Sequence, residues 1–164
     1  MTSTLIQMQR ATQRLTQYAL YISAAGLVLM TLIISWQVFA RYMLNASPSW
    51  SESAALLLML YYILLTAAVG VYESFHLGIN ILVDKSPPKI ARILKVINYS
   101  LICVFGLAML LNGVRLADFT SDHVIPALSI SRAFAYWPFA IAGALICIFA
   151  LEKILFLFVI KEAK

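Results

Sequence analysis

The chain has 164 residues and a formal net charge of +5, with 63% hydrophobic and only 12% charged residues. Soluble domains carry about twice that charged fraction, so a soluble fold is excluded and lipid must solvate much of the surface. The composition predicts an all-α integral membrane protein that forms one domain over residues 1–164, with no room for a second, catalytic domain.

Four charge-free apolar runs predict the membrane-crossing helices. Each run holds about 20 residues, the number needed to cross about 30 Å of hydrocarbon. None of them shows the alternation of a barrel strand, so each run is expected to be helical. We expect transmembrane helices over residues 17–44, 50–72, 89–116 and 131–160.

The first two helices are joined by a short turn between residues 44 and 49. Asn45 to Pro48 is a turn signal, and Ser49 to Glu52 has the S-x-x-E form of a capping box that opens a helix. Arg41 lies one turn before the predicted end of the first helix, and Trp50 belongs to an aromatic belt at this turn. The capping box explains Glu52 better than contact with another protein does. For Arg41, interaction with the helix dipole competes with such a contact as the explanation.

An amphipathic helix is predicted over residues 75–85, between the second and third transmembrane helices. Its apolar residues recur at helical spacing, while His76, Asn80 and Asp84 share another face. We expect this helix to lie in the membrane interface. Two prolines at 87 and 88 end it, because neither can donate a backbone hydrogen bond.

Basic residues follow the proline pair and set the expected orientation. Lys89, Arg92 and Lys95 form one face of the third helix and are expected to contact anionic lipid headgroups. The positive-inside rule favours a cytoplasmic location for both termini and for the interfacial helix. In that topology the cytoplasmic segments hold nine of the basic residues, and the outer segments hold only Arg41, Arg115 and Arg132.

The fourth helix is expected to open at Trp137 and Pro138, with Tyr136 and Trp137 as interfacial anchors. Glu152 and Lys153 follow its apolar run and are expected at the cytoplasmic interface or against a partner. Other polar and small residues within the runs predict hydrogen bonds and close packing between helices. These residues are Gln37, Asn98, Asn112, Ala24 to Gly26, Ala67, Ala68, Gly143 and Ala144.

No arrangement of residues indicates an enzyme, a metal site or a cofactor. His76 and His123 fall on opposite sides of the membrane in this topology, so they cannot share a haem or a zinc ion. Cys103 and Cys147 lie inside apolar runs and are expected to be buried free thiols. The apolar runs hold no charged residue, which argues against a transport path through this chain alone.

The order of these motifs resembles a known family. F-x-R-Y-x-L-N ends the first helix, P-x-W-S-E opens the second, and Y-E-x-x-H-L-G-I-N-I-L-V-D precedes the proline pair. Together with Trp137-Pro138 they resemble the small membrane subunit, of DctQ type, of tripartite ATP-independent periplasmic (TRAP) transporters. The resemblance covers roughly residues 36–157.

The resemblance implies a non-catalytic subunit of a sodium-driven transporter in a bacterial inner membrane. Its partners would be a large, elevator-type membrane subunit that holds the sodium and substrate sites, and a periplasmic protein that delivers an organic acid such as a C4-dicarboxylate or sialic acid. The small subunit would scaffold and anchor the large one. Residues that match the family motifs or carry charge at helix ends are the expected partner contacts: Arg41, Trp50, Glu52, Glu73, His76 and Asp84.

Two other classes of protein remain as alternatives. A stand-alone small multidrug-type exporter needs a membrane-embedded carboxylate and a weak charge bias, neither of which the sequence offers. A membrane anchor of a redox complex would bind haem and show a haem absorption band. Binding haem needs paired intramembrane histidines, which the sequence does not offer.

Overall fold

The computed structural model describes residues 2–46, 48–73 and 87–162. Most of these residues are helical, and four helices are long and apolar enough to cross a membrane, as expected. The predicted interfacial helix over residues 75–85, with His76 and Asp84, lies outside the described residues. The elements are α1 (Thr2–Met43), α2 (Ser49–Tyr72), α4 (Pro88–Phe119), β1 (Val124–Ile125), β2 (Ile130–Ser131), the 3-10 helix η1 (Arg132–Ala135) and α5 (Trp137–Glu162).

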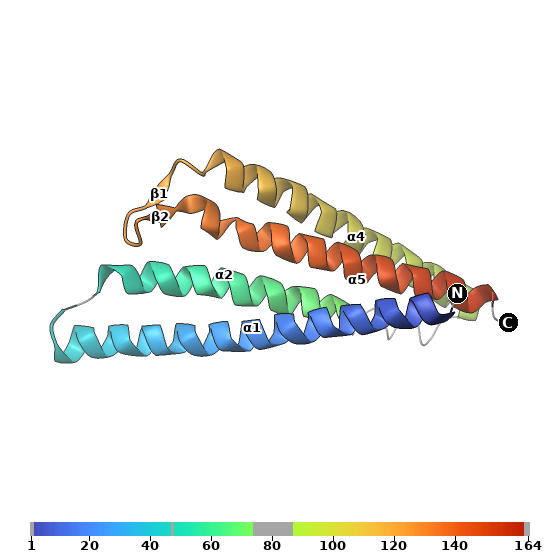
Figure 1. The fold of residues 1–164 in the computed structure, drawn as a ribbon, viewed down its shortest axis with the longest axis horizontal. Helices are drawn as coiled ribbons and strands as arrows, with labels where there is room; N and C mark the ends of the chain where they lie inside the picture. Colours follow the sequence, from blue (N-terminus) through green and yellow to red (C-terminus); the bar gives the residue numbers. More distant parts are fainter. Residues whose placement is uncertain (1, 47, 74–86, 163–164) are drawn as a thin grey trace.

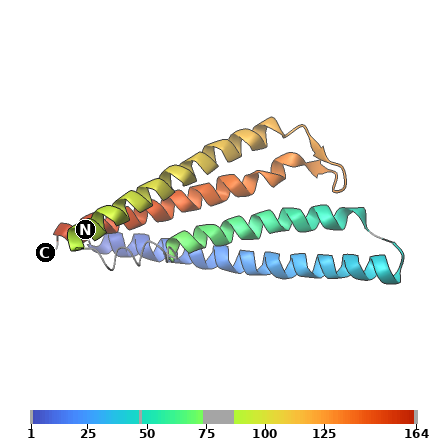
Figure 2. The same cartoon turned by 180° about the vertical axis from the view of Figure 1, so that it is seen from behind.

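The four long helices lie in the order α1, α2, α5, α4, so that each contacts the next in an open array. Figures 1 and 2 show two antiparallel pairs, α1 with α2 and α4 with α5. The pairs converge where α1 begins and α5 ends, which we call the terminal end. They spread apart toward the α1–α2 turn and the β1–β2 hairpin, which we call the hairpin end.

Helix α1 is far longer than expected. It begins at Thr2 rather than near residue 17 and runs without a break for 42 residues. At 1.5 Å per residue it is about 63 Å long, roughly twice the hydrocarbon thickness. The polar residues before Tyr18 lack the apolar signal used to locate spans, but they hold no helix breaker, so the helix simply continues through them.

A narrow seam on α1 makes its contact with α2. Between residues 12 and 40 every residue off this seam is exposed. The seam positions alternate steps of four and three, the 3.5-residue period of a left-handed coiled coil. Where Gly26 lies, an added Cβ would meet Tyr62 Cβ at 3.3 Å, so the two helices are close. The buried or half-buried positions are Thr12, Thr16, Ala19, Ser23, Gly26, Met30, Ile33, Gln37 and Ala40.

The turn between α1 and α2 forms, but not with the predicted cap. Asn45 adopts a positive φ of 50°, a conformation that Asn tolerates better than most residues. The amide of Ala46 donates to the Ala40 carbonyl at 3.1 Å. Helix α2 begins at Ser49 with Pro48 as its N-cap residue, and no side-chain hydrogen bond caps it.

The predicted capping box is therefore wrong. Ser49 lies inside the helix, one residue later than a cap requires, because Pro48 supplies the extended conformation that precedes the first turn. The hydroxyl of the buried Ser51 donates back to the Pro48 carbonyl at 2.8 Å. Glu52 is thus left in the first turn without the capping role that its sequence position predicted.

Helices α4 and α5 approach each other closely at three glycines. A Cβ added at Gly143 would lie 2.6 Å from both the Gly106 carbonyl oxygen and the Leu110 nitrogen. One added at Gly113 would lie 2.7 Å from the Ala140 nitrogen. The predicted close packing at Gly143 is confirmed, and Gly106 and Gly113 extend it along α4.

A small buried core joins the two pairs, with α2 against α5. Ala68 and Val71 of α2 pack with Ile146 and Phe149 of α5. The Phe149 ring also lies 5.3 Å from the Tyr72 ring, centroid to centroid, in a tilted arrangement. The predicted close-packing role of Ala68 is confirmed, since its side chain is fully buried.

The segment between α4 and α5 is not the plain loop expected of an all-α protein. Strands β1 and β2 pair antiparallel, with Val124 opposite Ser131. Ser129 adopts a φ of 54° in the hairpin turn. The 3-10 helix η1 follows, so α5 begins at Trp137, as the Trp137-Pro138 pair predicted, and the expected range from residue 131 also took in η1. The Tyr61 hydroxyl of α2 donates to the Phe134 carbonyl at 3.0 Å and ties η1 to α2.

The glycine contact between α4 and α5 yields a stability prediction. Replacing Gly143 by Leu should lower the free energy of unfolding in detergent by about 1 to 3 kcal/mol, because the new side chain must push the α4 backbone away. Replacing the exposed Ala25 of α1 by Leu adds a similar volume on a free face and should change stability little. Equal stabilities of the two variants in a chemical denaturation series would contradict the close contact.

Candidate subunit interface

Three of the predicted contact residues lie at the hairpin end. Arg41 lies in the last turn of α1, and Trp50 and Glu52 lie in the first turn of α2. The side chains of all three are exposed, with Trp50 42% accessible. An exposed aromatic ring beside groups of both charges is typical of a protein contact or a membrane boundary.

The other predicted contact residues do not join them. Glu73 caps the C-terminus of α2 at the terminal end, where its amide donates to the Val69 carbonyl at 3.0 Å and its side chain is exposed. His76 and Asp84 lie outside the described residues. The described members of the predicted set therefore lie at both ends of the molecule, with Arg41, Trp50 and Glu52 at one end and Glu73 at the other.

The predicted lipid-facing basic residues lie in the first turns of α4, at the terminal end. Lys89, Arg92 and Lys95 follow Pro88, which occupies the first helical position. Arg92 is exposed and Lys95 is half-buried. Their spacing of three residues places them on neighbouring positions of one helix surface.

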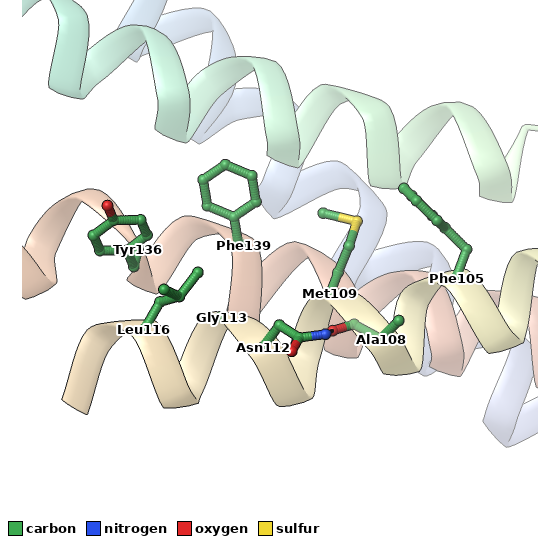
Figure 3. Close-up of a pocket in the computed structure, with 8 residues that line it drawn as sticks. All are labelled: Phe105, Ala108, Met109, Asn112, Gly113, Leu116, Tyr136 and Phe139. Atoms are coloured by element: carbon green, nitrogen blue, oxygen red, sulfur yellow. Dashed lines mark hydrogen bonds between the residues drawn. The ribbon is translucent and has the colours of Figure 1, made fainter. Parts of the chain in front are cut away.

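An apolar hollow of about 300 Å³ lies over the α4–α5 contact. Figure 3 shows its lining side chains, which come from α4 and from the start of α5, with Phe139 and Leu116 among them. Asn112 lies in this lining, and its amide nitrogen donates to the Ala108 carbonyl of its own helix at 2.8 Å. A hydrogen bond from the exposed Asn112 to another helix stays a prediction.

Sequence reasoning missed the most deeply buried charged residue. Glu152 was expected at the cytoplasmic interface or against a partner, and its burial within this chain was not predicted: its side chain is only 2% exposed. It accepts a hydrogen bond from the Thr12 hydroxyl of α1, with 2.9 Å between Oγ1 and Oε1. One sequence feature pointed to the burial of Glu152: it is a lone carboxylate directly after a charge-free run. Its partner on α1 was not predicted, because the sequence did not reveal that α1 begins as early as Thr2.

The described residues contain no group of three or more His, Cys, Asp and Glu side chains that could hold a metal ion. Cys103 and Cys147 are free and half-buried, and the Cys147 thiol donates to the Cys103 carbonyl at 3.4 Å.

Four membrane-crossing helices in an open array, with charged and aromatic groups at their ends, define a multi-pass helical membrane protein. The chain belongs to the DctQ component family of tripartite ATP-independent periplasmic transporters, whose sequence profile matches residues 30–159. Family and spans together place it in the bacterial inner membrane. Membership also implies a complex with a large membrane subunit and a periplasmic binding protein.

Three curated relatives carry similar sequences. The sialic acid TRAP transporter small permease protein SiaQ of Vibrio cholerae is 28% identical over 123 residues, which cover 74% of this chain and 70% of that protein. A putative TRAP transporter small permease protein of Haemophilus influenzae is 25% identical over 132 residues, 79% of this chain and 80% of its own length. The C4-dicarboxylate TRAP transporter small permease protein DctQ of V. cholerae is 23% identical over 84 residues, 51% of this chain but only 36% of that protein.

Proposed function

We propose that this chain is the non-catalytic small subunit of a sodium-driven TRAP transporter that imports an organic acid of the sialic acid or C4-dicarboxylate class. The family match over residues 30–159 carries the proposal. The names of the relatives supply the two candidate classes of solute. In this proposal the sodium and substrate sites belong to the large subunit.

The shape of the array supports a scaffolding role. Helices α1 and α4 lie at its two edges, and each contacts its neighbour along one narrow seam. Their remaining faces are exposed and apolar over most of the membrane thickness, with residues such as Leu32, Phe105 and Leu111. A flat array of this kind can widen the stationary part of a transporter within the bilayer and anchor it there.

The distribution of buried charge supports the absence of a transport path through this chain. Within the described residues, Glu152 is the charged side chain that is buried. It lies at the terminal end rather than in the middle of the membrane, where ion and substrate pathways place such groups. The large subunit is the better candidate for that pathway.

We further propose that the terminal end is cytoplasmic and the hairpin end periplasmic. The distribution of basic residues favours this orientation, with nine in the segments at the terminal side. Arg41, Trp50 and Glu52 would then face the delivery protein or the outer edge of the large subunit. Glu73, His76 and Asp84 would contact a partner on the cytoplasmic side, and Lys89, Arg92 and Lys95 would contact anionic phospholipid.

Uptake by the assembled transporter tests the proposed contacts. Replacing Arg41 or Glu52 by Ala should reduce the initial rate of uptake of labelled sialic acid or C4-dicarboxylate by about tenfold, the effect of losing one hydrogen bond to a charged group across an interface. Replacing Cys103 or Cys147 by Ser serves as the control and should leave uptake nearly intact. Normal uptake by both charge variants, at equal expression, would remove these residues from the interface.

The orientation can be tested separately by thiol labelling. In a background with Cys103→Ser and Cys147→Ser, the exposed residues Ser121 and Gln13 are replaced one at a time by Cys. Ser121→Cys, at the hairpin end, should react with a membrane-impermeant maleimide in spheroplasts. Gln13→Cys, at the terminal end, should react only after the membrane is opened, and the reverse pattern would overturn the orientation.

A further inference from the structure

Only one of the two carboxylate oxygens of Glu152 has a hydrogen-bond partner in the described structure. Its Oε1 accepts from the Thr12 hydroxyl, but its buried Oε2 has no hydrogen-bond partner among the described residues. A buried carboxylate oxygen without a donor is costly, and most such groups in native proteins have a partner. The site therefore calls for a ligand that supplies a hydrogen-bond donor.

A cavity of about 240 Å³ lies beside this carboxylate. It is lined by Glu152 itself and by Gln9, Tyr72, Lys153 and Phe156, which come from α1, α2 and α5. The Lys153 ammonium lies 5.0 Å from the centre of the Tyr72 ring, in the position of a cation–π contact. A carboxylate and an ammonium group thus line the same small cavity.

The cavity lies at the depth of lipid headgroups. Tyr72 is the last residue of α2, and Glu152 directly follows the charge-free run of α5, so both mark the end of the apolar zone at the terminal end. Figures 1 and 2 show the start of α1 against the end of α5 at this place. Gln9 and Thr12 of α1 precede residues 30–159, which match the family profile. The part of the site that α1 contributes therefore lies outside the matched region.

The two charges restrict what can bind. An anionic headgroup would be repelled by Glu152, and a basic side chain of another protein would be repelled by Lys153. A zwitterion with a primary ammonium group satisfies both, because the ammonium offers three N–H donors and the phosphate is a good partner for lysine. Choline headgroups carry the same charges but no N–H donor.

We propose that this cavity binds the headgroup of an ethanolamine phospholipid. The lipid ammonium donates to Glu152 Oε2, and its phosphate lies against Lys153 Nζ. The bound lipid fastens α1 to α2 and α5 at the terminal end, where the two helix pairs converge. This site is distinct from the basic residues at the start of α4, and it does not depend on which solute is transported.

Lipid retention by the purified full-length chain tests the proposal. The chain is delipidated in detergent and mixed with phosphatidylethanolamine, phosphatidylcholine or phosphatidylglycerol of matched acyl chains, and the lipids that stay bound are counted by native mass spectrometry. The wild type should retain phosphatidylethanolamine about tenfold better than the other two, the preference expected from one hydrogen bond to a charged group.

Two variants and one control locate the binding. Glu152→Gln keeps an acceptor for Thr12 but loses the charge, and it should retain phosphatidylethanolamine no better than phosphatidylcholine. Lys153→Gln should weaken retention of both zwitterionic lipids. If circular dichroism shows that Glu152→Gln loses helical content, the result for Lys153→Gln decides the test. Asp118→Asn removes an exposed carboxylate at the hairpin end and should behave as the wild type.

Three results would overturn the proposal. Equal retention of the three lipids by the wild type would mean that ordered water, and not a lipid, donates the hydrogen bond to Glu152 Oε2. Unchanged preference in both cavity variants would place the lipid elsewhere. Loss of the preference when the large subunit is co-purified would assign Glu152 to a basic side chain of that subunit.

Discussion

Close backbone contact at small residues is the constraint on which the rest of the structure depends. Apolar side chains gain little by leaving lipid for one another, so helices in a bilayer associate through packing at short range. Gly106, Gly113 and Gly143 provide that packing between α4 and α5. Gly26 provides it between α1 and α2, where an added Cβ would meet Tyr62 Cβ at 3.3 Å. Because both seams are narrow, the helices form pairs and leave broad apolar faces, and no closed bundle results.

The way the pairs meet gives the two ends different properties. At the terminal end, Ala68 and Phe149 bring α2 and α5 together, and the long α1 reaches far enough for Thr12 to bond Glu152. Toward the hairpin end the pairs spread, and a hollow of about 420 Å³ lies between α2 and the residues around η1, with Arg132 in its lining. One end is thus suited to anchoring in the headgroup region, and the other presents Arg41, Trp50 and Glu52 on a broad surface. Both properties fit the accessory subunit that we propose.

The sequence predicted the features that depend on apolar length and missed those that depend on contacts between distant residues. Four spans, the turn after Met43 and the close packing at Gly143 followed from run length, Asn45 and small-residue content. The start of α1 at Thr2 was missed because polar residues in a helix give no apolar signal. The capping box at Ser49 failed because Pro48 already provides the extended N-cap residue. The burial of Glu152 was missed because only the three-dimensional structure brings it beside Thr12, a residue 140 positions earlier.

The central claim is that this open array is one part of a larger membrane complex. The chain can be co-expressed with its large membrane subunit, purified through a tag on this chain alone and sized in mild detergent. We expect the two chains to elute together in constant proportion, and cross-links from the large subunit to fall on the exposed faces of α1 or α4. Elution of this chain as a monomer, with the large subunit well expressed in the same membranes, would contradict it.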